Sequence, residues 1–150
     1  MPIATTNAYE ELLTAFASHI GIHAETFVEM QEIVIDDLAI GLAYEQADDR
    51  ACMTYFANLG RPAAKRAETV HQTLLEANHM WVGTGGATLG LQQATGNIIM
   101  AGQTSMEDLS PESLARLLNT FADIASRWKG FIDGHYEISE TPPEPFALRA

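Results

Sequence analysis

Large and small apolar residues alternate along residues 38–44, and this pattern constrains the fold more than any other part of the chain. The large residues Leu38, Ile40, Leu42 and Tyr44 are separated by Ala39, Gly41 and Ala43. A period of two residues is that of a β-strand with one bulky face and one small-residue face. The small face would let another element, in the first place a helix of the same chain, pack close to the strand.

Four more segments have strand character. Residues 33–35 predict a short strand before the alternating segment. Residues 50–59 predict another after the turn Ala47-Asp48-Asp49, with Met53 and Tyr55 on one face and Cys52 and Phe56 on the other. Residues 87–91 and 97–101 flank the turn Thr95-Gly96-Asn97, and so predict a β-hairpin.

Apolar residues at helical spacing predict three helices. The first follows Asn7, which has the spacing of a capping box with Glu10, and ends at Gly21. The second follows Pro62, and the last starts at Ser110-Pro111 with Ser110 as the cap. Their apolar stripes are Tyr9, Leu12, Leu13, Phe16 and Ile20; Ala67, Val70, Leu74, Ala77 and Trp81; and Leu114, Leu117, Leu118, Phe121, Ile124, Ala125 and Trp128.

The order of these elements is helix, three strands, helix, two strands, helix. Grouped strands favour an α+β fold in which helices cover an antiparallel, partly twisted sheet of about five strands. Residues 1–134 are predicted to form a single domain. Residues 135–150 contain three prolines and several acidic residues, and are predicted to form a flexible tail.

The charge of the chain excludes some classes of partner. Its formal net charge is −12, and only residues 61–104 carry more basic than acidic residues. An acidic surface repels nucleic acid and anionic membranes, because both require basic residues to neutralise phosphate. The single cysteine, Cys52, allows neither a disulfide framework nor a cluster of metal-bound thiolates, so a cytosolic location is expected. Neither a signal peptide nor a transmembrane helix is expected from the apolar segments.

The glycine-rich segment 83–90 raises the alternative of a nucleotide-binding loop. A dinucleotide fingerprint requires a strand before the glycines and a helix after them. The predicted order here is the reverse, and no lysine lies within the segment. A tight turn from helix to strand, in which glycine accepts positive φ, is the simpler interpretation.

No catalytic or metal-binding residues are predicted, and no cofactor. His19 and His23 are separated by the helix end at Gly21, while His71 and His79 have no acidic residue at a recognised ligand spacing. The paired acidic residues fall in a helix start and in turns. The inventory of apolar residues, which includes two tryptophans and six methionines, exceeds what one core of this size easily buries. A partner chain or a second subunit would cover the excess.

Three segments carry a family resemblance. Residues 74–78 (LLEAN), 83–91 (GTGGATLGL) and 95–100 (TGNIIM) resemble the central signature of the class I type III secretion chaperones, the Tir chaperone family. The last predicted helix is similar to the last helix of that family. In element order the resemblance extends over residues 7–134, although its specific part is 74–100.

The resemblance implies a homodimer in the bacterial cytoplasm that binds an extended segment near the N-terminus of a secreted effector protein. It implies that the chaperone keeps this segment secretion-competent and aids its delivery without being an enzyme. The implied dimer interface comprises Val70, Leu74, Trp81 and Val82. The implied effector-binding residues are Leu13, Phe16, Ile20, Ile33, Ile35, Leu38, Ile40 and Leu42, several of which must belong to the core.

Two alternatives remain open at this point. One is an adaptor or exit-control regulator of type III secretion that binds several effectors or the secretion ATPase. The other is a small enzyme or ligand-binding domain that uses residues 83–90. Phe16 also has two interpretations, as an anchor for the effector or as a core residue, because apolar helix faces usually belong to the core.

Overall fold

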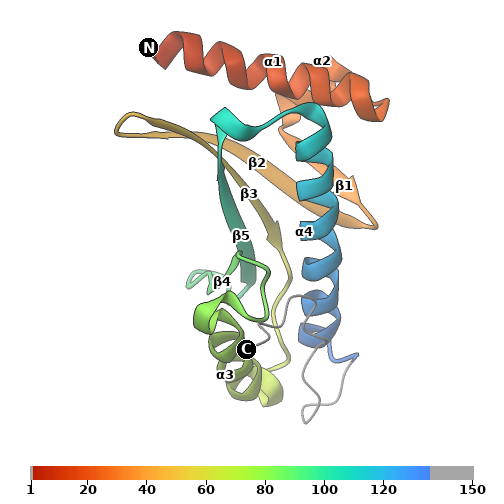
Figure 1. The fold of residues 1–150 in the computed structure, drawn as a ribbon. Helices are drawn as coiled ribbons and strands as arrows, with labels where there is room; N and C mark the ends of the chain where they lie inside the picture. The colour runs from red at the N-terminus through yellow and green to blue at the C-terminus, as the bar shows by residue number, and fades with distance from the viewer. Residues whose placement is uncertain (1, 136–150) are drawn as a thin grey trace. The chain divides into compact units, whose positions relative to one another are not determined.

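The computed structural model describes residues 2–135, with side chains from residue 7 onward except those of residues 47 and 108. The predicted tail lies outside the described residues from position 136. Two compact units divide the chain. Unit 1 contains the residues up to Tyr55 together with Gln103–Thr120, and unit 2 contains Phe56–Gly102 and the residues from Phe121. Figure 1 shows the elements.

The predicted α+β class and the five antiparallel strands are confirmed. The strands form one sheet in the order β1-β2-β3-β5-β4, so β1 and β4 are its edge strands. In the register, Ile33 lies opposite Ile40 at one edge and Leu89 opposite Met100 at the other. The strands are β1 (Glu32–Ile35), β2 (Leu38–Ala47), β3 (Arg50–Asn58), β4 (Thr88–Leu91) and β5 (Ile98–Ser105).

The number of helices differs from the prediction, because the described residues contain four α-helices where three were expected. They are α1 (Pro2–Ile20), α2 (Ala24–Met30), α3 (Ala67–Asn78) and α4 (Pro111–Ile132). Helix α2 has only seven residues, and its ends lack the usual sequence signals. His23 caps its N-terminus by accepting from the Thr26 N–H, and Gln31, at φ 51°, ends it where glycine is common.

Helix α1 begins earlier than predicted. It starts at Pro2, so Asn7 lies inside the helix and the capping-box prediction is wrong. Proline suits a first helical position, because its fixed φ matches the helix and it has no N–H to leave unpaired. The predicted end is confirmed: Gly21 adopts φ 81° and its N–H donates to the Ala17 carbonyl.

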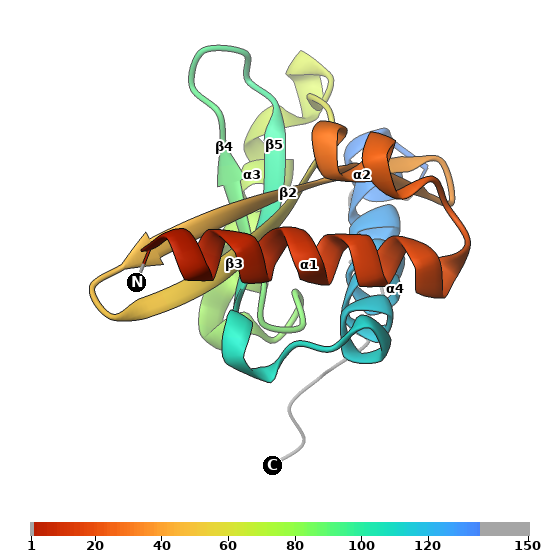
Figure 2. The same ribbon diagram turned by 90° about the horizontal axis from the view of Figure 1, so that it is seen from above.

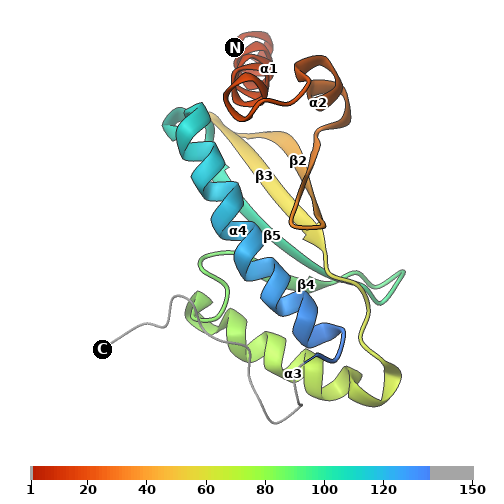
Figure 3. The same ribbon diagram turned by 90° about the vertical axis from the view of Figure 1, so that its right-hand side faces the viewer.

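The core of unit 1 forms where α1 crosses β2 (Figure 2), with α1 and α2 side by side (Figure 3). Phe16 and Phe27 join the two helices at a ring-centroid distance of 5.5 Å. The bulky residues of β2 are buried from Leu38 to Leu42, whereas Ala39 on the small-residue face is exposed. The bulky face therefore carries the packing, and the predicted close approach of a helix to the small face is wrong.

In unit 2, α3 lies beside the C-terminal end of α4 (Figure 3). Arg66 joins them: its Nη1 donates to the Ile132 carbonyl at 3.1 Å and its Nη2 to the Phe131 carbonyl at 3.0 Å. The guanidinium also lies 5.5 Å from the centroid of the Phe131 ring. These carbonyls belong to the last turn of α4, where the helix itself provides no N–H donor for them, although the Phe131 carbonyl also accepts from the Gly134 N–H. The predicted hairpin is confirmed as β4 and β5.

The predicted apolar stripe of the second helix extends too far. Helix α3 ends at Asn78, and a 3-10 turn follows over His79–Trp81. Met80 and Trp81 both adopt left-handed backbone conformations, with φ 55° and 56°. Trp81 therefore lies outside the stripe. At the start of α4 the predicted cap is confirmed, since the Ser113 N–H donates to Ser110 Oγ at 3.1 Å. Within residues 2–135, no helix is both long and apolar enough to cross a membrane.

Candidate partner-binding surfaces

Unit 1 exposes four large apolar side chains between residues 20 and 34. Ile20 and Ile22 are 37% and 39% exposed, and Met30 and Val34 are each 63% exposed. Ile20 ends α1, Ile22 lies in the connection to α2, Met30 ends α2 and Val34 lies in the edge strand β1. We call these four residues the β1 surface. In the register Val34 lies opposite Ala39, so it faces away from the side of the sheet on which α1 packs. Where exposed apolar side chains form a contiguous patch, they commonly mark a site of protein interaction.

The local structure explains why these side chains are exposed. Strand β1 alternates in the usual way, so Val34 points to the opposite face from the half-buried Ile33 and Ile35. Because β1 is an edge strand that pairs only with β2 in the sheet, one side of its backbone has no strand partner among the described residues. Such an edge can accept a further strand through main-chain hydrogen bonds.

The predicted effector-binding residues fall into two groups. Most are in the core of unit 1 and have at most 4% of their area exposed: Leu13, Phe16, Leu38, Ile40 and Leu42. The others are accessible, since Ile20 is exposed and Ile33 and Ile35 are half-buried. Phe16 has the core position that was one of its two interpretations.

Sequence reasoning missed the rest of the β1 surface, namely Ile22, Met30 and Val34. Met30 is the last residue of α2, the helix that was not predicted, and Ile22 lies just before its cap. The signal that could have found Val34 is the alternation of β1 itself. Once Ile33 and Ile35 were assigned to one face, the residue between them had to lie on the other.

Unit 2 exposes a second apolar group around the end of α3. Leu75, Met80 and Trp81 are 71%, 61% and 54% exposed, and we call these three residues the α3 surface. Of the predicted dimer residues, Trp81 is in this group and Val82 is half-buried. Val70 and Leu74 are buried within their own unit. Leu75 follows Leu74 directly and so lies on another face of the helix, which is the signal that was available for it.

The segments that resemble the family signature build the connection from α3 to β4. The Asn78 side chain holds β4 twice: its Nδ2 donates to the Leu89 carbonyl at 2.7 Å, and its Oδ1 accepts from the Leu89 N–H at 2.9 Å. Trp128 Nε1 donates to the Gly83 carbonyl at 2.8 Å. A Cβ at Gly83 would lie 2.8 Å from Ala77 Cβ, so only glycine fits there without movement.

The glycine-rich segment follows a helical segment and precedes a strand, as predicted. Gly85 and Gly86 adopt φ 62° and 95°, which glycine accepts without strain. Its role in the described structure is to form the turn that returns the chain to β4. The arrangement of helix before glycine and strand after it does not place a helix N-terminus at these amides, as a phosphate site of the dinucleotide type requires.

The ionisable groups are dispersed. Among residues 2–135 there is no group of three or more His, Cys, Asp or Glu side chains arranged to hold a metal ion. His23 is engaged as the cap of α2, and Cys52 is half-buried in β3. Burial raises the pKa of Tyr9 to about 12, and its hydroxyl donates to Gln31 Oε1 at 2.7 Å, so this group stabilises the fold in its neutral form.

An α+β scaffold that presents an open sheet edge and two exposed apolar surfaces is of the kind that binds other polypeptides. Residues 11–129 match the model of the Tir chaperone protein (CesT) family. The chain therefore belongs to the Tir chaperone family, which is a family of chaperones. No curated protein sequence matches it significantly.

Solved structures with the same fold include three complexes. The crystal structure of the ExsC–ExsE complex aligns with a TM-score of 0.68 at 19% identity, over 87% of this chain and 98% of the other. The HopA1–SchA chaperone–effector complex aligns with a TM-score of 0.62 at 20% identity, over 81% and 93%. The Yersinia pestis type III secretion chaperone SycH, in complex with a fragment of YscM2, aligns with a TM-score of 0.56 at 20% identity, over 79% and 97%.

Proposed function

We propose that this protein is a type III secretion chaperone of the bacterial cytoplasm, which binds an extended N-terminal segment of an effector and keeps it secretion-competent. Membership of the Tir chaperone family supports the proposal. The similar structures add support, because one is described as a chaperone–effector complex and another as a type III secretion chaperone. The action needs binding energy alone, so the chain requires neither a cofactor nor catalytic residues.

The observation that carries the proposal is the open edge of β1 beside exposed apolar side chains. An added strand satisfies main-chain hydrogen bonds without requiring one particular side-chain sequence. The exposed side chain of Val34 offers apolar contact to the alternate residues of such a strand that lie on the same face of the sheet. Met30, which ends α2 shortly before β1, offers a further exposed apolar side chain. Among the predicted residues, Ile20, Ile33 and Ile35 fit this role, whereas the buried residues such as Phe16 position the surface from below.

We further propose that the chain acts as a homodimer through the α3 surface. An exposed tryptophan and two other large apolar side chains leave an area in water that a second copy would bury. Trp81 has the character of an interface anchor, since tryptophan is enriched among residues that dominate binding energy. Val70 and Leu74 support the interface by holding α3 on its own unit, and the half-buried Val82 lies next to it.

The two surfaces can be tested separately. The effector is first identified by isolating the tagged chain from a secreting host, and its N-terminal fragment is then made for calorimetry. Val34→Glu places a charge on the β1 surface and should weaken binding of this fragment by about 5- to 150-fold, the range for loss of one good anchor. The dimer should persist. Leu75→Glu is the matched variant on the α3 surface, and should weaken the dimer in light scattering at micromolar concentration.

Each proposal has its own contradicting result. If Val34→Glu and Met30→Glu both bind the effector fragment with wild-type affinity, the β1 surface is not part of the binding site. A monomer mass for the wild-type chain would contradict the homodimer. Recovery of several unrelated effectors, each with its N-terminal segment bound, would favour the multi-effector adaptor over a chaperone dedicated to one partner.

A further inference from the structure

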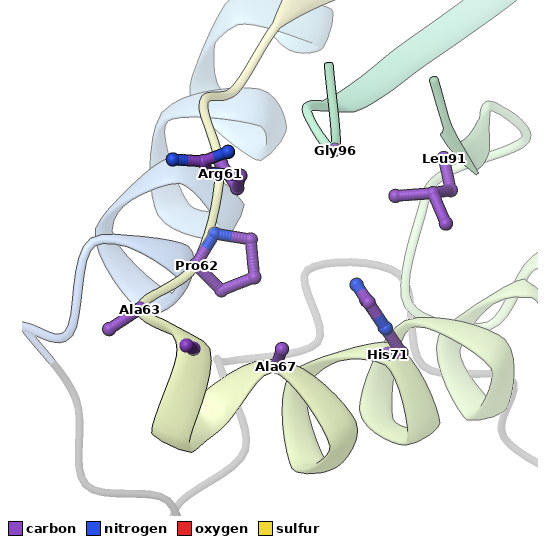
Figure 4. A pocket seen from close by; sticks show the side chains of 8 residues that line it. Arg61, Pro62, Ala63, Ala67, His71, Leu91 and Gly96 are labelled. Atoms are coloured by element: carbon purple, nitrogen blue, oxygen red, sulfur yellow. The ribbon is translucent and has the colours of Figure 1, made fainter. Parts of the chain in front are cut away.

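Unit 2 contains a pocket that the proposed function does not use. Its volume is about 560 Å³, and it lies between the turn of the β4–β5 hairpin and the start of α3 (Figure 4). Its lining is mainly apolar with two polar side chains, and includes Arg61, Pro62, Ala67, His71, Leu91 and Gly96. Leu91 is 56% exposed, so one wall of the pocket is an apolar side chain in contact with water.

The cation of the pocket has no acidic partner among residues 2–135. The ion pairs of the described residues join Arg127 to Asp123 and Lys129 to Asp133, both along or at the end of α4, and none of them involves Arg61. The stem of Arg61 packs on the hairpin turn, because a Cβ at Gly96 would lie 2.8 Å from Arg61 Cδ. The guanidinium is thereby held at the pocket, where it can bind a carboxylate.

His71 supplies a second polar group. Its ring points from α3 into the space between Pro62 and Leu91 (Figure 4). Its Nε2 atom is buried and has no hydrogen-bond partner among the described residues. A buried polar atom is usually paired, and leaving it unpaired is unfavourable. An occupant of the pocket that brings an oxygen acceptor would satisfy this nitrogen when it carries the proton.

We propose that this pocket binds the acidic segment of the same chain that follows His135. The hydrogen bonds from Arg66 to Phe131 and Ile132 place the end of α4 beside residue 66, which is next in sequence to Ala67 of the pocket lining. The end of α4, from which the chain continues toward residue 136, is therefore close to the start of α3. Because the segment is covalently attached near the pocket, its effective concentration at the pocket is high. A separate chain would need a higher affinity or concentration to compete with it.

The sequence of this segment complements the pocket. It contains Glu137, Glu140 and Glu144, whose carboxylates suit Arg61 and His71. It also contains apolar residues for the wall formed by Pro62, Ala67 and Leu91, namely Ile138, Phe146 and Leu148. Fifteen residues can span up to roughly 50 Å when extended, so reach does not limit the contact. The inference does not depend on the proposed chaperone function.

Amide NMR spectra of the full-length chain test the contact. The combined variant Glu137→Gln, Glu140→Gln and Glu144→Gln should shift the resonances of residues 61–67, of His71 and of Leu91, and should leave those of α1 unchanged. A matched control replaces three exposed acids of unit 1, Glu10, Glu11 and Glu29, by glutamine, and should leave the pocket resonances in place. The reciprocal variant Arg61→Gln should shift the amides of residues 137–148.

Two results would overturn the proposal. One is the absence of shifts at the pocket in the combined variant, or of shifts in residues 137–148 in Arg61→Gln. The other concerns the origin of the acidic segment. If an unlabelled wild-type chain, mixed and equilibrated with the labelled combined variant, restores the wild-type pocket resonances, then the segment comes from a second copy and the contact within one chain is refuted.

Discussion

Replacing Gly83 by alanine should destabilise the protein through a single added methyl group. The new Cβ would lie 2.8 Å from Ala77 Cβ, 3.3 Å from Ala77 Cα and 3.3 Å from Trp128 Cζ2. Two of these atoms belong to the small, helix-bound Ala77 and the third to a buried ring, so none can move aside as a flexible side chain would. Overpacking of this kind lowers the free energy of unfolding by about 1–3 kcal/mol.

Urea unfolding at a fixed protein concentration measures this change, because assembly would otherwise alter the apparent stability. Gly90→Ala is the matched control. A Cβ there meets only the Ile99 carbonyl oxygen, at 4.0 Å, and Gly90 does not have positive φ. The urea midpoint of Gly90→Ala should equal that of wild type or be slightly higher. Equal midpoints for Gly83→Ala and wild type would refute the close-contact argument, as would equal losses in both alanine variants.

Three further predictions concern single contacts. Asn78→Ala removes both hydrogen bonds to the Leu89 backbone and should lower the free energy of unfolding by about 1–3 kcal/mol in urea, with Gln93→Ala, at an exposed turn position, as a neutral control. Arg66→Met keeps much of the side-chain bulk but loses the hydrogen bonds to the Phe131 and Ile132 carbonyls. Amide hydrogen exchange at the end of α4 should therefore be faster than in wild type. Unchanged protection of these amides would contradict the role of Arg66. Because the pKa of Tyr9 is raised to about 12, the folded state retains a proton that the unfolded state loses above pH 10. The free energy of unfolding should therefore fall from pH 10 to 12 more steeply in wild type than in Tyr9→Phe. The same pH dependence in both proteins would be the contrary result.

Much of the fold could be predicted because local patterns and tertiary packing agree. The alternation of β2, the cap at Ser110 and the hairpin turn at Gly96 each correspond to an observed element. Helix α2 could not be predicted, since its N-cap is a histidine and its end a glutamine in the left-handed region. The end of α3 was also misplaced, because Met80 and Trp81 adopt a conformation that their side chains disfavour.

The candidate surfaces were predicted less well than the fold. The family resemblance implied effector-binding residues on the apolar stripes, among them Leu13, Phe16 and Ile40. Hydrophobic periodicity marks residues that face a core, and the structure buries these three. Surface contacts depend on apolar residues that break the stripe, such as Val34 and Leu75. Sequence spacing treats these residues as exceptions, although they are the side chains that remain available to a partner.

The turn at Met80 and Trp81 has a consequence for how this chain can change. Two successive non-glycine residues in the left-handed region each cost on the order of 1 kcal/mol, which glycine would not incur. Selection for thermal stability alone would therefore favour glycine at both positions and remove two of the three side chains of the α3 surface. A more stable variant obtained in this way would be a poorer partner, so stability and association oppose each other at this turn.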